Sequence, residues 1–98
     1  MIERIDDAGN ELARDPTGSA LERYKRAVRE LLDCAVAECM QLQSESSAGF
    51  TRRVFSTITR VDITLSELTD AVLGRQQDVL RLRSLLDQVK GLIVDLYR

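Results

Sequence analysis

Apolar residues recur every three or four positions through most of the sequence, the spacing that places side chains on one face of an α-helix. This pattern predicts long helices over residues 19–43 and 75–97, with a third long helix between them. The middle helix is the most regular, with alternating spacings of four and three at Val54, Ile58, Val61, Leu65, Leu68 and Val72. Such an a/d seam is typical of helices that pack against one another.

Turn-forming residues separate the helices. Pro16 lacks a backbone donor and disfavours helical geometry in the residue before it, so it predicts a break. Ser19 and Glu22 have the spacing of a capping box, which predicts that the next helix starts there. Residues 44–49 (SESSAG) lose the periodicity and predict a loop. Gly74 can end or bend the third helix, and we expect it to end it.

A shorter amphipathic segment runs from Ile2 to Arg14, and Gly9 and Asn10 interrupt it, so it predicts a marginal helix that needs a partner. Its apolar residues are Ile2, Ile5, Ala8 and Leu12. The seam of the helix over residues 19–43 is Leu21, Tyr24, Val28, Leu31, Leu32, Ala35, Cys39 and Leu42. The seam of the last helix is Val79, Leu82, Leu86, Val89, Leu92, Ile93 and Leu96. These patterns predict an all-α fold: an antiparallel bundle of three long helices plus a short N-terminal helix, forming one domain over residues 1–98.

Four further apolar residues lie off the main seams: Ile63, Leu73, Leu80 and Leu85. They supply more apolar surface than one narrow stripe requires. Two interpretations remain open, completion of a four-helix core and an interface between two copies, and we favour the first.

Composition narrows the classes of function. The 98 residues can build one core, and their net charge of −2 gives no general attraction to phosphate, so nucleic-acid binding is disfavoured. The acidic amino terminus is unlike a secretory signal and no stretch approaches a membrane span, so we expect a cytoplasmic protein without membrane contact. Cys34 and Cys39 lie five residues apart on one predicted helix, which does not suit a disulfide and fits a reducing compartment.

Few residues offer catalytic chemistry. The chain has no histidine, no phosphate-binding loop and no dinucleotide fingerprint, so we expect no metal site, no cofactor and no enzymatic activity. Asp62 and Asp95 could act as acid and base or as cation ligands, although isolated carboxylates more often form salt bridges. Tyr24 and Tyr97 lie on apolar faces, where tyrosine is usually structural.

Two groups of polar residues are candidate binding surfaces. The first is an interaction cluster across the second and last helices, with Asp62 beside it: Arg23, Tyr24, Lys25, Asp62, Asp95 and Tyr97. The second is a basic patch for RNA or an acidic protein, made of Arg52, Arg53 and Arg60. Acidic residues are interleaved with the arginines of the last two helices, which is typical of a solvated face.

Three segments carry a family resemblance: residues 21–28 (LERYKRAV), 61–73 (VDITLSELTDAVL) and 91–97 (GLIVDLY). In order and spacing they resemble the YaaR-like family of small bacterial proteins, a domain of unknown function. The resemblance implies a helical bundle of the bacterial cytoplasm with no assigned catalytic activity. The chain departs from the family at Phe55, where we expect tyrosine, and in having a shorter amino-terminal segment than many members.

The sequence as a whole favours a non-catalytic bacterial protein that works through another protein, as an interaction module or regulatory adaptor, with self-association as a further mode. The alternatives are a regulator that binds nucleic acid through its arginine-bearing faces and a small-ligand receptor that uses the polar cluster.

Overall fold

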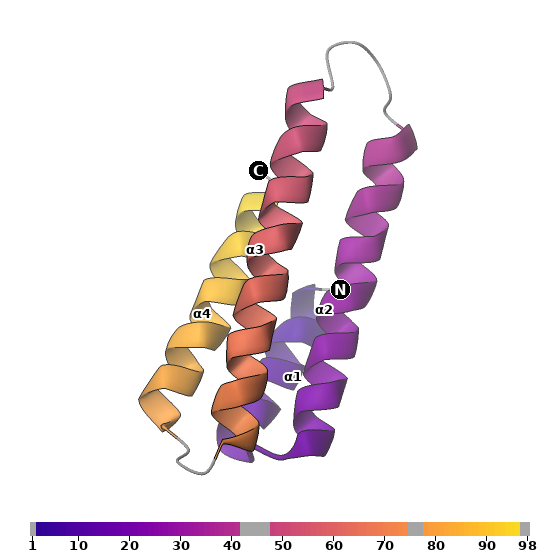
Figure 1. Ribbon diagram of the computed structural model, residues 1–98. Coiled ribbons are helices and arrows are strands. Elements are labelled where there is room, and N and C mark those ends of the chain that lie inside the picture. The colour runs from indigo at the N-terminus through magenta and orange to yellow at the C-terminus, as the bar shows by residue number, and fades with distance from the viewer. Residues whose placement is uncertain (1, 42–47, 75–77, 97–98) are drawn as a thin grey trace.

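The computed structural model describes the backbone of residues 2–41, 48–74 and 78–96, and within these the side chains of residues 3–38, 52–74 and 78–96. The described part contains four helices and no strand (Figure 1). They are α1 (Ile2–Arg14), α2 (Gly18–Gln41), α3 (Ala48–Leu73) and α4 (Val79–Leu96). The predicted all-α fold, with three long helices and a short first one, is confirmed.

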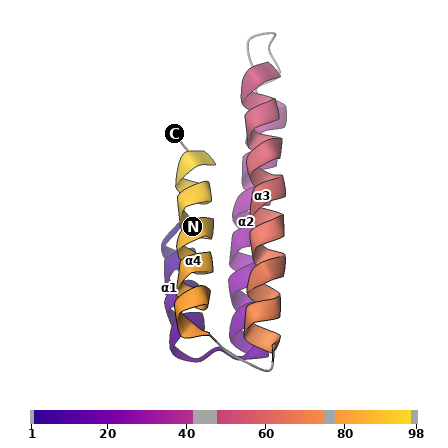
Figure 2. The same ribbon diagram turned by 60° about the vertical axis from the view of Figure 1, so that its left-hand side comes forward.

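The four helices pack in a ring, with α1 against α2, α2 against α3, α3 against α4, and α4 against α1. Consecutive helices run antiparallel, so α1 and α4 are also antiparallel (Figure 1). The 24 residues of α2 and the 26 of α3 make them much longer than α1, which has 13. As a result, α2 and α3 extend beyond the other two helices at one end of the bundle (Figure 2).

Thr17 caps the N-terminus of α2, because its hydroxyl oxygen accepts a hydrogen bond from the amide of Ala20 at 3.1 Å. The predicted capping box of Ser19 and Glu22 is therefore wrong. The helix already begins at Gly18, so Ser19 lies inside its first turn. Thr17 is the last residue before the helix and carries the oxygen that the free amides of that turn require.

The end of α3 is set by Gly74, whose amide donates to the carbonyl of Asp70 at 2.9 Å. A Cβ at Gly74 would lie 2.7 Å from the Asp70 oxygen, so glycine fits where a side chain would clash. The predicted helix end at Gly74 is confirmed. The expected start of the last helix near residue 75 falls outside the described residues. In the structure, α4 begins at Val79. The side chain of Asp78 accepts hydrogen bonds from the amides of Leu80 and Arg81 and so caps this helix.

The core follows the predicted seams closely. All six seam residues of α3 are buried except Ile58, which is half-buried. The buried apolar side chains of the other helices are Ile5 and Leu12 in α1, Ala20, Leu21, Tyr24, Val28, Leu31, Leu32 and Ala35 in α2, and Leu82, Leu85, Val89, Ile93 and Leu96 in α4. Cys34 is a free, half-buried cysteine, whereas the predicted seam positions Cys39 and Leu42 lie outside the described side chains.

Two positions of α4 differ from the prediction. Leu85, expected off the seam, is only 3% exposed, whereas Val79, expected on the seam, is 50% exposed. Leu85 faces the core because α4 packs against both α3 and α1 and so buries a wider stripe than a two-helix seam. Val79 is the first residue of its helix and lies at the end of the bundle.

Candidate interaction surface

The three α2 members of the predicted polar cluster point in different directions. Arg23 forms an ion pair with Glu11 of α1, while Tyr24 is 2% exposed and belongs to the core. Lys25 is half-buried and lies one helical turn before Arg29, whose guanidinium faces α3. Arg23 and Lys25 therefore lie on opposite sides of Tyr24.

The two aspartates of the cluster are also apart. Asp62 of α3 pairs with Arg29 of α2 at 3.7 Å. The backbone carbonyl of Asp95 accepts a hydrogen bond from Arg53 at 3.0 Å, so the end of α4 lies level with Arg53. Arg53 and Asp62 are nine residues apart, which is about 13 Å along a helix. The structure thus does not bring Asp62 and Asp95 into one site, and Tyr97 lies outside the described residues.

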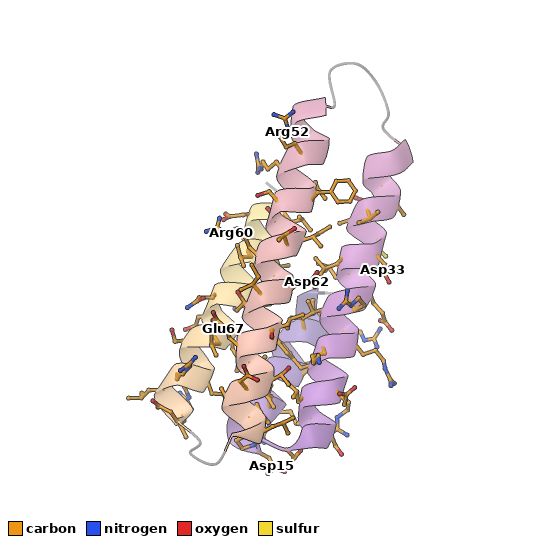
Figure 3. All side chains as sticks on the ribbon, viewed as in Figure 1. Asp15, Asp33, Arg52, Arg60, Asp62 and Glu67 are labelled. Carbon is orange, nitrogen blue, oxygen red and sulfur yellow. The ribbon has the colours of Figure 1, made fainter. Side chains whose placement is uncertain are left out.

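The three arginines of the predicted basic patch are exposed, but they are spread over α3. Arg53 and Arg60 lie seven residues apart and share the flank that faces α4, whereas Arg52 points about 100° away from Arg53. Figure 3 shows Arg60 and Glu67 on the α4 side of α3 and Asp62 on the α2 side. Glu67 and Arg60 line the same shallow depression between α3 and α4, so negative charge accompanies the arginines there.

Tyr24 contributes to a groove of about 490 Å³ between α1 and α4. Burial, and secondly the charge of Asp6, raise the pKa of the Tyr24 phenol far above its usual range. Asp6 in turn lies 3.5 Å from Lys90 of α4 and pairs with it. The phenol is therefore a neutral group held between helices, and its ring fills the core rather than projecting to solvent.

Large apolar side chains reach solvent on only one half of the described structure. Six of them are at least 41% exposed, and all six belong to α3 or α4: Phe55, Ile63, Leu73, Val79, Leu80 and Val94. Leu80 is the most exposed at 81%. Three of the four off-seam residues found in the sequence, all but Leu85, are in this group. These three residues do not complete the core. Our preferred interpretation from the sequence, that the off-seam residues complete a four-helix core, is therefore correct only for Leu85.

The outer surface of the described part of α1 and α2 is different, because most of its exposed side chains are charged. Arg4 of α1 pairs with Glu30 of α2 at 3.2 Å, and Arg23 pairs with Glu11 across the same two helices. These exposed ion pairs keep that half well solvated. The bundle therefore has a charged half, α1–α2, and an apolar-bearing half, the α3–α4 hairpin.

Sequence reasoning missed Phe55, Val79 and Val94 as surface residues. Val94 could have been found, because it lies fourteen residues after Leu80 and so repeats the same helical direction after two heptads. Val79 could not, because its exposure depends on where α4 starts. Within the described ranges, no group of three or more cysteine and acidic side chains is placed to hold a metal ion. None of the helices described is both long and apolar enough to cross a bilayer.

A family model described as "Protein of unknown function (DUF327)" matches residues 1–97. The chain belongs to this family. Its fold is similar to the crystal structure of the uncharacterised protein BH1478 from Bacillus halodurans, with a TM-score of 0.84 and 31% sequence identity. The alignment covers 98% of this chain and 80% of the Bacillus protein. No curated protein gives a significant match.

Membership of DUF327 agrees with the YaaR-like resemblance of the three sequence segments. Since the family is described as having unknown function and its solved relative as uncharacterised, neither supplies a ligand or a partner. The surface of the chain itself is therefore the basis for assigning a role.

Proposed function

We propose that this protein is a non-catalytic interaction module of the cytoplasm, and that the outer surface of its α3–α4 hairpin binds another protein. The observation that carries the proposal is the restriction of all six exposed large apolar side chains, among the described residues, to α3 and α4. Scattered exposed apolar residues are ordinary on a soluble protein, but their confinement to one half of a bundle is typical of a binding surface.

The chemistry of this surface suits a protein partner. The exposed Ile63 lines the depression between α3 and α4 together with the charged Arg60 and Glu67, the mixture of apolar anchors and polar rim found in protein interfaces. A helix of the partner could lie along the depression between α3 and α4, where the half-buried Leu92 and the exposed Gly91 leave space. The free thiol of Cys34 is consistent with a reducing compartment.

Site-specific photo-cross-linking tests this proposal. A benzophenone amino acid is placed at Ile63 or Leu80 on the α3–α4 hairpin and, as a matched control, at exposed Arg26 on α2. We expect protein adducts in a lysate of the source cells from the first two positions but not from Arg26, and the same adducts after nuclease treatment.

Equal labelling from all three positions, or no adduct from any, would contradict the proposal. Adducts that disappear with nuclease would favour the alternative of nucleic-acid binding, which uses the arginines rather than the apolar residues.

A further inference from the structure

The outward side of α4 carries a regular row of exposed residues: Leu80, Ser84, Asp87, Gly91 and Val94. Their spacings alternate between four and three, so they form a second seam on the side of α4 opposite its buried residues. A second row, Arg81, Gln88 and Asp95, lies beside it on the flank toward α3 and is also exposed. These two rows together are called the α4 outer face.

The residues of the α4 outer face are spaced evenly about its middle, with apolar residues at both ends of the first row and opposite charges at the two ends of the second. Leu80 and Val94 are each seven residues from Asp87, so the row has an apolar residue at both ends. In the second row, Arg81 and Asp95 are each seven residues from Gln88, so the two ends carry opposite charges. Neither of these two side chains forms an ion pair with another described residue.

Such a face is complementary to itself when a second copy runs antiparallel. A two-fold axis through the middle of the face reverses the second helix, and it brings Leu80 of each copy opposite Val94 of the other. The same two-fold rotation leaves the α3-facing flanks of the two copies on the same side of the dimer. Arg81 of each copy therefore faces Asp95 of the other. Two apolar contacts and two ion pairs then form at once.

We propose that α4 binds α4 of a second copy through this face and forms an antiparallel, two-fold symmetric homodimer. The inference rests on the proposed function and names a second copy of the chain as the occupant of the α4 side of that surface. Ser84 of one copy lies opposite Gly91 of the other, and a Cβ at Gly91 would have no neighbour within 4 Å in the single chain. The two backbones can therefore approach closely between the apolar ends.

One feature of the face opposes the dimer. The two Asp87 carboxylates come close to the two-fold axis, where like charges repel. Arg83 lies one turn before Asp87 on the same helix and partly offsets its charge, whereas Lys90, one turn after it, pairs with Asp6 of α1. Because an 18-residue helix offers a small interface, the dimer belongs to the weak, transient class.

Sedimentation equilibrium of the purified full chain, from micromolar to millimolar concentration, tests the inference. The weight-average mass of the native protein should rise from one chain toward two. Leu80→Lys should stay monomeric over this range, whereas Ala37→Lys should behave as the native protein. Ala37 is a matched control because it is an exposed apolar residue of α2, outside the α3–α4 hairpin.

A charge-swap pair identifies the register. Arg81→Glu alone should weaken the dimer at least tenfold, and the double variant with Asp95→Arg should restore most of the affinity, because the reversed pair is again attractive. Circular dichroism confirms that each variant remains folded. A native protein that stays monomeric at millimolar concentration overturns the homodimer. A dimer whose affinity is unchanged by Leu80→Lys and by both charge-swap variants overturns it as well. Neither result affects cross-linking of the hairpin to a different protein, which tests the proposed function separately.

Discussion

Gly9 of α1 lies directly against the aromatic ring of Tyr24 of α2. A Cβ at Gly9 would sit 3.4 Å from Cε2 of Tyr24 and 3.9 Å from Cδ2 of Leu86 in α4. Gly9 is buried although it interrupts the apolar pattern of α1. The glycine that makes the helix intrinsically weak is therefore also the residue that lets it pack closely on its two neighbours.

Side-chain size at Gly9 should decide the stability of the α1 contact. Gly9→Ala places a methyl group at normal van der Waals distance and removes the helix penalty of glycine, so we expect stabilisation of at most about 1 kcal/mol. Gly9→Leu drives a bulky group into Tyr24 and should lower the free energy of unfolding by about 1–3 kcal/mol. Urea denaturation followed by circular dichroism measures both. Equal stability of the two variants would show that the contact is loose.

Tyr24 should make the fold sensitive to alkali. Burial raises the pKa of its phenol in the folded state, with Asp6 as a second cause, whereas the unfolded chain ionises near pH 10. Above that pH the unfolded state binds fewer protons than the folded state, so the free energy of unfolding falls, by up to about 1.4 kcal/mol per pH unit. Below that pH this contribution is constant.

The check is the unfolding free energy measured from pH 9 upward for three proteins. Tyr24→Phe should lose the part of the decline that the native protein shows above about pH 10. Tyr97→Phe, which removes the only other tyrosine, is the control for the effect of losing a phenol. Parallel curves for the native protein and Tyr24→Phe would contradict the role assigned to burial.

Leu85 and Leu80 should respond oppositely to truncation, although both lie off the predicted seam. Leu85 is 3% exposed and Leu80 is 81% exposed. Leu85→Ala should lower the free energy of unfolding by about 2–5 kcal/mol, because it leaves a cavity. Leu80→Ala should change it by no more than about 0.5 kcal/mol at low protein concentration. Thermal and urea unfolding of the two variants measure the difference, and similar losses would place α4 in a different rotation.

Thr17 and Ser19 provide a matched test of the α2 cap. Thr17→Ala removes the oxygen that accepts from the Ala20 amide and should cost about 1 kcal/mol of stability. Ser19→Ala lies inside the first turn, where alanine is the better helix former, so it should be neutral or slightly stabilising. The ranking of the two midpoints in urea is the measurement. A larger loss for Ser19→Ala would return the cap to the position that the sequence pattern suggested.

Asp87 should oppose the proposed homodimer. Asp87→Asn removes the like charges near the two-fold axis while keeping the shape of the side chain, so the dimer should become tighter. Sedimentation equilibrium at low salt should show the largest gain, since salt screens the repulsion in the native protein. Unchanged or weaker association would mean that Asp87 lies away from the axis.

The number, type and order of the helices could be predicted from the sequence. Apolar residues at helical spacing and the breaks at Pro16 and Gly74 are local features, and helix geometry converts them directly into elements with one buried face. The same periodicity identified almost all of the α3 core, since five of its six seam residues are buried and Ile58 is half-buried. Conversely, consecutive residues such as Arg23, Tyr24 and Lys25 could not form one cluster, since a helix turns each by about 100°.

Only the tertiary structure decided which off-seam residues are buried. Leu85 and Leu80 are alike in the sequence, yet the contact of α4 with both α3 and α1 buries the first and leaves the second in solvent. Likewise, the pairing of Asp62 with Arg29 depends on residues 33 positions apart along the chain that pack between helices. Such burial and pairing depend on the rotation of each helix about its axis. That rotation is fixed by the packing of all four helices together, whereas the pattern of one segment determines only the face that prefers to be buried.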